Sequence, residues 1–152
     1  MSAAAVVPAA GKGIRIQSRI PKVLIPLLGK PMLQWTLERI QQSAVFNAIL
    51  VACPPGEERA FQESLAAAPG DIPIIFVTGG ETRQDSVANC RAQLPEDCDL
   101  VAVHDGARPL VTEAILRETL DTAARSGAAI AAVPCKDTIK ICDERGVITQ
   151  TL

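Results

Sequence analysis

The chain has 152 residues, of which 48% are hydrophobic and 21% charged, and its formal net charge is −2. This length and balance fit one folded domain with its own core, and they exclude a disordered chain. Aromatic residues make up only 3% with no Tyr, so binding of nucleic acid by base stacking is not expected. No apolar run reaches the length of a membrane span. The apolar start lacks the basic region of a signal peptide and fits a first strand instead.

Strand and helix signals alternate along residues 1–136. The predicted strands are apolar runs without period-two alternation, typical of strands buried on both faces, at 3–8, 48–53, 74–77, 100–103 and 128–133. The predicted helices span 31–43, 57–67, 82–94 and 112–126. This order predicts an α/β fold in which helices cover both faces of a parallel sheet, a three-layer α/β/α sandwich.

Two of the helices carry capping signals in the sequence. Thr82 and Asp85 have the spacing of a capping box, in which each side chain binds the other residue's backbone N–H. Thr112 is a predicted N-cap, and Gly127 is predicted to end the helix that Thr112 begins.

The last sixteen residues have a different pattern. Residues 137–141 and 147–151 alternate polar and apolar side chains on either side of the turn residues 143–146, which predicts a β-hairpin. We therefore divide the chain into a nucleotide-binding α/β domain, 1–136, and the start of a β-arm, 137–152. The arm would protrude and offer an exposed edge to a partner. Because the sequence stops within a strand, we expect a longer protein.

Residues 8–22, PAAGKGIRIQSRIPK, follow the first predicted strand and carry the strongest functional signal. Gly11 and Gly13 let backbone N–H groups wrap a polyphosphate, because no side chain blocks the approach. Arg15 and Lys22 add two positive charges for the phosphate oxygens. The segment matches neither the Walker loop nor the dinucleotide fingerprint, which require further residues that are absent here.

The charge of the chain is unevenly distributed. The first 37 residues contain no Asp or Glu but five Lys and Arg residues, although the whole chain is slightly acidic. Local basic charge on an acidic chain suits a compact anionic ligand better than a nucleic acid. The alternative is a solvated basic surface with no ligand.

A second polar cluster, HDGARP, follows the strand predicted at 100–103. Ligands of open α/β sheets bind at the carboxyl ends of the strands, so Asp105 could bind Mg²⁺ and Arg108 a phosphate. The alternative is a turn residue with its surface ion-pair partner. His104 fits a packed or hydrogen-bonded role better than a catalytic one, since phosphoryl-type chemistry needs little acid–base help.

A third segment, residues 79–87, lies after the strand predicted at 74–77 and should reach the same edge of the sheet. Its glycines permit a flat ligand to lie against the backbone, and Ser86 could hydrogen-bond a base or a ribose. The alternative is an ordinary strand-to-helix turn.

The scattered cysteines bear on metal binding and on the compartment. None of the five lies in a Cys-x-x-Cys pair, and His104 is the only histidine, so a zinc site is not expected. An odd number of scattered cysteines is typical of a reducing cytoplasm.

The three segments together resemble a known family. PAAGxGxR with Pro-Lys, GGxxRxDSV and VHDxARP, in this order, are similar to the motifs of the 2-C-methyl-D-erythritol 4-phosphate cytidylyltransferases of the non-mevalonate isoprenoid pathway. The resemblance covers essentially the whole chain, although the first motif is shared with many sugar-nucleotide pyrophosphorylases. It implies a Rossmann-like, GT-A-like nucleotidyltransferase that works with Mg²⁺ or another divalent cation and forms a homodimer through the β-arm.

The resemblance also implies an activity. The enzyme would transfer CMP from CTP to 2-C-methyl-D-erythritol 4-phosphate, forming 4-diphosphocytidyl-2-C-methyl-D-erythritol and releasing pyrophosphate. It would work in the cytoplasm, or in the plastid stroma of a eukaryote. A ribitol-5-phosphate cytidylyltransferase and a non-catalytic nucleotide-binding domain are the alternatives. Arg15, Lys22 and Asp105 argue against the second of these.

Residue roles follow from the same resemblance. Arg15 and Lys22 would stabilise charge during attack on the α-phosphorus. The implied CTP contacts are Pro8, Ala9, Ala10, Gly11, Gly13, Gly80, Ser86, Asp105 and Ala107. Asp105 would also bind the metal, and the implied substrate contacts are Arg108 and Thr138. The family's substrate-positioning arginine and lysine lie beyond Leu152, so this chain lacks both. Gly106 stands where alanine is also used.

Overall fold

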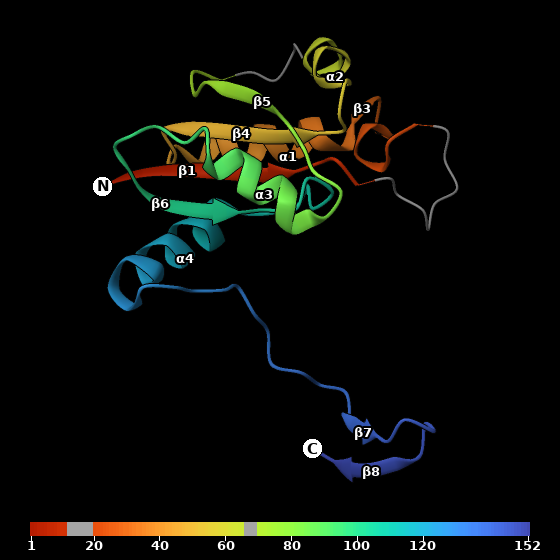
Figure 1. Cartoon of the computed structure of the whole chain (residues 1–152). Coiled ribbons are helices and arrows are strands. Elements are labelled where there is room, and N and C mark those ends of the chain that lie inside the picture. The colour runs from red at the N-terminus through yellow and green to blue at the C-terminus, as the bar shows by residue number, and fades with distance from the viewer. Residues whose placement is uncertain (12–19, 66–69) are drawn as a thin grey trace.

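A computed structural model describes residues 1–11, 20–65 and 70–152 (Figure 1). Its centre is a four-stranded sheet of order β5-β4-β1-β6, in which every pair is parallel. The strands are β1 (Ser2–Pro8), β4 (Ala48–Cys53), β5 (Ile74–Thr78) and β6 (Cys98–Val103). The helices are α1 (Met32–Ser43), α2 (Glu58–Ser64), α3 (Arg83–Arg91) and α4 (Glu113–Ser126). The shorter elements are η2 (Lys22–Leu24), β2 (Pro26–Leu27) and β3 (Lys30–Pro31).

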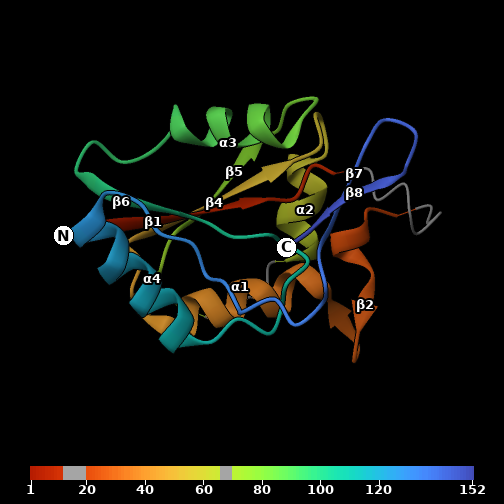
Figure 2. The same cartoon turned by 90° about the horizontal axis from the view of Figure 1, so that it is seen from below.

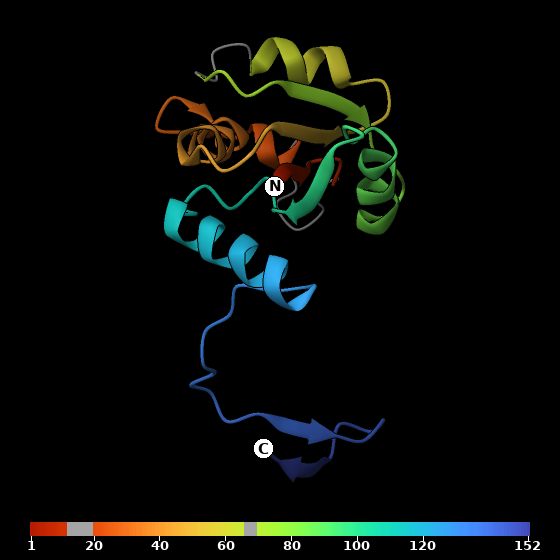
Figure 3. The same ribbon diagram turned by 90° about the vertical axis from the view of Figure 1, so that its left-hand side faces the viewer.

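The alternating side chains of β1 separate the core into two layers. Ala5 and Val7 pack in one cluster with residues of α1, α2 and α4, whereas Ala4 and Val6 pack in another with Cys90 of α3. Figures 2 and 3 show α3 on one side of the sheet and α1 and α4 on the other. The predicted three-layer α/β/α arrangement is therefore confirmed. None of the helices within the described residues has the length and apolarity needed to cross a membrane.

Several predicted boundaries differ from those of the structure. The helix predicted at 31–43 begins at Met32 with Pro31 as its N-cap, and the helix predicted at 82–94 ends at Arg91. The helix predicted at 57–67 ends at Ser64, and residues 66 and 67 lie outside the described residues. These differences fall at helix ends, where propensity is weakest and capping decides the boundary.

Two predictions about the sheet are wrong. Residues 128–139, all of which the structure describes, form neither helix nor strand, and Ile130 and Val133 are almost fully exposed. An apolar run becomes a strand only where a neighbour accepts its backbone hydrogen bonds, and this segment runs away from the sheet (Figure 1). Strand β6 is also not buried on both faces, because Val101 and Val103 are partly exposed on the α3 side.

The predicted hairpin is confirmed as β7 (Lys140–Cys142) paired antiparallel with β8 (Ile148–Thr151). It stands apart from the central sheet, joined to α4 by residues 127–139 (Figure 1). The apolar side chains of the hairpin are partly exposed, among them Ile141 and Ile148.

The capping box predicted at the start of α3 is present. The Thr82 side chain accepts a hydrogen bond from the Asp85 backbone N–H at 3.1 Å, and the Asp85 carboxylate accepts one from the Thr82 backbone N–H at 3.0 Å. Thr112 caps α4 with its own side chain, which accepts from the Ile115 N–H, and Gly127 ends α4 in the left-handed conformation. The sequence patterns therefore identified both helix starts correctly.

We expect Thr82→Ala to lower the free energy of unfolding by about 1 kcal/mol, because the substitution removes the acceptor at the start of α3. Urea unfolding followed by circular dichroism measures the change. Thr119→Ala is the control, because it removes a hydroxyl within α4 that bonds the Ile115 carbonyl, at a position where alanine is a better helix former. An equal loss of unfolding free energy in both variants would show that the Thr82 cap makes no specific contribution to stability.

Candidate active site

A cavity of about 390 Å³ opens at the edge of the sheet where β1, β5 and β6 end. Its walls are formed by residues 8–11, by Lys22 and Val23, by residues 80–83 with Ser86, and by residues 105–108. The three segments singled out in the sequence thus meet around one cavity. Gly13 and Arg15 lie outside the described residues, and Thr138 is not among the residues that line this cavity.

Backbone hydrogen bonds continue the sheet into the cavity wall. The Ala9 N–H donates to the Ala52 carbonyl at 2.9 Å, and the Gly79 N–H donates to the Cys53 carbonyl at 2.7 Å. A Cβ at Gly79 would lie 2.5 Å from the Ala10 Cβ and 2.8 Å from the Cys53 oxygen. Only glycine fits here, and the first segment can therefore lie directly against the third.

The loop before α3 is held by Ser86, which is 2% exposed. Its hydroxyl accepts a hydrogen bond from the Gly80 N–H at 3.1 Å and donates one to the Thr82 carbonyl at 3.0 Å. Ser86 therefore shapes the turn, a role that the sequence analysis did not assign. Its contact with a base or ribose stays a prediction, as does that of Gly80.

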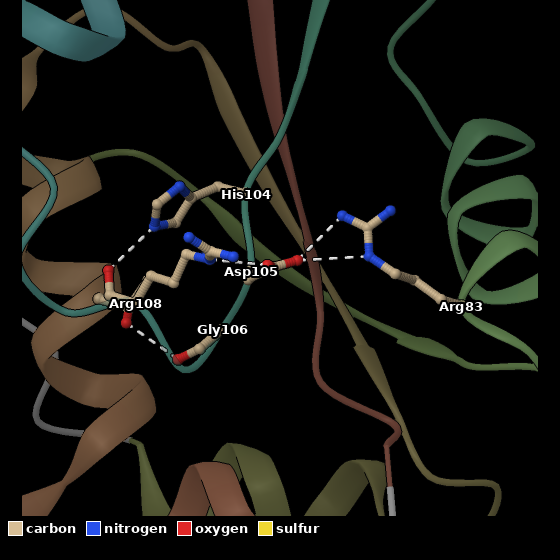
Figure 4. Close-up of polar contacts among 6 residues, drawn as sticks. Arg83, His104, Asp105, Gly106 and Arg108 are labelled. Atoms are coloured by element: carbon tan, nitrogen blue, oxygen red, sulfur yellow. Dashed lines mark hydrogen bonds and ion pairs between the residues drawn. The ribbon is translucent and has the colours of Figure 1, made fainter. Parts of the chain in front are cut away.

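Asp105 is bound by two arginines from opposite sides (Figure 4). Its Oδ1 accepts from Arg83 Nη2 at 2.9 Å and from Arg83 Nε at 3.3 Å, and its Oδ2 accepts from Arg108 Nε at 2.8 Å. Burial alone would raise the pKa of Asp105, but the hydrogen bonds and positive charges of the two arginines outweigh it and lower the pKa. The carboxylate is therefore ionised at neutral pH.

The loop that carries Asp105 is fixed by further polar contacts. The Arg108 N–H donates to the Asp105 carbonyl at 3.0 Å, and the His104 ring nitrogen Nε2 lies 3.1 Å from the Arg108 carbonyl, to which it can donate (Figure 4). The Thr36 hydroxyl of α1 donates to the Gly106 carbonyl at 2.9 Å. His104 thus has the hydrogen-bonded role expected from the sequence, and it braces the loop that holds Arg108.

Two carboxylates, those of Asp105 and Glu81, lie among the described residues that line the cavity, and they do not make a complete set of ligands for a divalent cation. Among the described residues, no group of three or more His, Cys, Asp or Glu side chains could hold a metal ion. The Asp105 carboxylate borders the cavity and is partly exposed. This fits Mg²⁺, which commonly takes one or two carboxylates and completes its shell with substrate phosphates and water.

Three positive side chains and one further carboxylate, that of Glu81, lie among the other described residues of the cavity wall. Lys22 begins the short helix η2, while Arg83 and Arg108 reach in from two other walls. Arg83 is a residue that the sequence analysis missed, because it was quoted within the GGxxRxDSV motif but given no role. Arg83 and Asp105 are 22 residues apart in the sequence, so their contact becomes visible only in the folded structure.

Comparison with known proteins agrees with this architecture. The family profile described as IspD, 2-C-methyl-D-erythritol 4-phosphate cytidylyltransferase, matches residues 3–152. A curated protein of that name from Syntrophus aciditrophicus is 43% identical over 150 residues, covering 97% of this chain and 64% of that protein. Another of that name, from Caldanaerobacter subterraneus subsp. tengcongensis, is 39% identical over 152 residues, covering 99% and 67%.

Solved structures are similar as well. The 4-diphosphocytidyl-2C-methyl-D-erythritol synthase of Anaerococcus prevotii superposes with a TM-score of 0.83 at 27% identity, over 99% of this chain and 63% of that one. The 2-C-methyl-D-erythritol 4-phosphate cytidylyltransferase of Thermus thermophilus superposes with a TM-score of 0.71 at 32% identity, over 100% and 64%. The chain thus spans about two thirds of the length of these relatives. From the matched profile, the relatives and the shared fold, the chain belongs to the 2-C-methyl-D-erythritol 4-phosphate cytidylyltransferase family.

Proposed function

We propose that the chain binds CTP in the cavity and transfers CMP to 2-C-methyl-D-erythritol 4-phosphate, releasing pyrophosphate. The observation that carries the proposal is the meeting of the three motif segments around one cavity, with Lys22, Asp105 and Arg108 on its walls. The names of the relatives supply the identity of the substrates. Within the cavity, the proposed CTP contacts among the described residues are residues 8–11, Gly80, Ser86, Asp105 and Ala107.

The proposed reaction is a direct displacement. An oxygen of the acceptor phosphate attacks the α-phosphorus of CTP and forms a new P–O bond, while the bond to the β-phosphate bridging oxygen breaks and pyrophosphate leaves. The nucleophile is already an anion, so no covalent enzyme intermediate and no general base are needed. The chain's residues align the reactants and neutralise charge, chiefly through Arg15 and Lys22, with Arg108 directed toward the acceptor phosphate. Mg²⁺ bound at Asp105 would supply further positive charge to the phosphate oxygens.

An assay of pyrophosphate release tests the proposal directly. We expect release with CTP and methylerythritol phosphate, and much less with ribitol 5-phosphate. Preference for ribitol 5-phosphate would identify the alternative cytidylyltransferase, and CTP binding without release of pyrophosphate with either acceptor would favour a non-catalytic nucleotide-binding domain.

The cysteines, all of them free, support the cytoplasmic location that we propose.

The hairpin supports a proposed homodimer. Strands β7 and β8 are short and exposed along their whole length, and a lone two-stranded hairpin is only marginally stable in water. Partly exposed Ile139, Ile141 and Ile148 give it an apolar surface to bury. A two-fold dimer, in which the arms pack on each other, is the commonest solution for such a surface. Thr138, the substrate contact implied by the resemblance, lies at the base of the same arm. Dimer formation through the arm would therefore be coupled to substrate binding.

We expect the chain to sediment as a dimer at micromolar concentration, and we expect Ile141→Asp to shift it to monomer because a charge would be buried in the interface. Analytical ultracentrifugation measures the change. Arg145→Asp is the matched control, since it places the same side chain in the exposed turn of the same hairpin. A monomer in the unmodified chain, or equal dissociation of both variants, would contradict pairing through the arm.

A further inference from the structure

Arg83 connects two walls of the cavity that are distant in the sequence. It is the first residue of α3, and its guanidinium reaches across to Asp105 in the loop after β6 (Figure 4). Arg108, the other partner of Asp105, belongs to that same loop and lies three residues away. The contact made by Arg83 therefore spans the cavity in which we place the nucleotide.

Stability does not explain this arrangement. The Arg83 side chain is 60% exposed and that of Asp105 39%, and ion pairs this exposed contribute little to folding free energy. A positive side chain in the first turn of a helix is also disfavoured by the helix dipole. Asp85, the nearest acidic residue on α3, uses its carboxylate for the Thr82 cap. The position of Arg83 is better explained by an anion that enters the cavity.

A nucleotide and its cation would alter the surroundings of the pair formed by Arg83 and Asp105. A divalent cation at Asp105 would sit beside both guanidinium groups, which repel it, and each carboxylate oxygen already accepts from one arginine. The triphosphate brings several negative charges to the same place, and a guanidinium forms strong paired hydrogen bonds with phosphate. Of the two arginines, Arg83 is anchored on the opposite wall and can turn toward the phosphates without disturbing the Asp105 loop.

We propose that Arg83 is a nucleotide-binding residue that exchanges the Asp105 carboxylate for a phosphate of the bound nucleoside triphosphate. In the nucleotide-free chain Arg83 bridges the cavity to Asp105. In the complex it contacts phosphate, and the carboxylate oxygen it leaves becomes accessible to the cation. This inference rests on the proposed function, because it takes CTP as the ligand of the cavity.

A double-mutant cycle on CTP affinity tests the exchange. CTP affinity is measured by isothermal titration calorimetry in excess EDTA, which removes divalent metal ions. The affinities then report the effects of Arg83 and Asp105 without a bound cation. We expect Arg83→Gln to weaken CTP binding about threefold in the unmodified chain and about tenfold in an Asp105→Asn background, and the tenfold loss corresponds to the weak end of hydrogen bonds to charged groups. The loss is larger in the second background because Arg83 no longer has to leave a carboxylate.

The controls separate this proposal from its rivals. Arg91→Gln removes the same charge from the exposed last turn of α3 and should leave the affinity unchanged, and Arg83→Lys should lose less than Arg83→Gln. No effect of Arg83→Gln in the Asp105→Asn background would mean that Arg83 only braces Asp105, and would overturn the inference alone. Failure of the unmodified chain to bind CTP would overturn the proposed function and the inference together.

Discussion

Lys22→Ala is expected to lower the turnover of CTP by about 100- to 1,000-fold while weakening CTP binding much less. Lys22 lies at the start of η2 and borders the cavity beside residues 8–11. In the proposed reaction its charge would meet the phosphates where negative charge grows as pyrophosphate leaves, and removing one such group typically costs a loss of this size. An interaction that strengthens in the transition state affects kcat more than substrate binding.

Steady-state pyrophosphate release and CTP titration by calorimetry, carried out on the same preparation, measure the two quantities separately. Lys136→Ala is the matched control, because it removes an exposed lysine from the segment between α4 and the hairpin. Turnover and affinity that fall together by small, equal factors would show that Lys22 is only a surface charge near the site.

The central fold could be predicted because its signals are local and agree with one another. Strands β1 and β4 are uninterrupted apolar runs, and both lie buried between neighbouring strands. The start of α3 was equally clear, since the Thr82–Asp85 capping box needs only residues within one turn. In these elements local sequence and tertiary packing point to the same structure.

The segment 128–133 shows the limit of the same reasoning. Its composition is that of a buried strand, yet Ile130 and Val133 are exposed and no ladder forms along it in the described structure. A strand is defined by its neighbours, and composition does not say whether a neighbour is present. The hairpin was easier to predict, because both of its strands and its turn lie within the short segment 140–151.

The location of the candidate site could be predicted from the sequence, but most of its side-chain contacts could not. Parallel strands end at one edge of a sheet, so the segments after β1, β5 and β6 had to converge. The internal bonds of Ser86 and the reach of Arg83 to Asp105 depend on side-chain directions that no local pattern encodes. The sequence therefore indicated which segments meet, and the structure identified which side chains meet.

Asp105→Asn is expected to raise the Mg²⁺ concentration needed for half-maximal CTP turnover by at least about tenfold. Asp105 is a partly exposed carboxylate that borders the cavity, where Glu81 is the one other acidic residue among the described lining residues, and the described residues contain no group of three metal-binding side chains. An amide is a poorer ligand for a hard cation than a carboxylate, and changing even an outer partner of a metal ligand commonly costs about ten- to a hundredfold in metal affinity. Loss of the negative charge also removes the attraction that draws the cation toward a cavity rich in arginine.

A magnesium titration of turnover at fixed CTP measures this shift, with Asp121→Asn on the exposed face of α4 as the control. Saturating Mg²⁺ should restore part of the activity, because the phosphates still supply ligands to the cation. The metal-free CTP affinity should not fall in the same variant, since the carboxylate repels the triphosphate and holds Arg83. An unchanged magnesium midpoint would remove Asp105 from the metal site, whereas a loss of metal-free CTP affinity would show that Asp105 acts mainly by positioning the arginines.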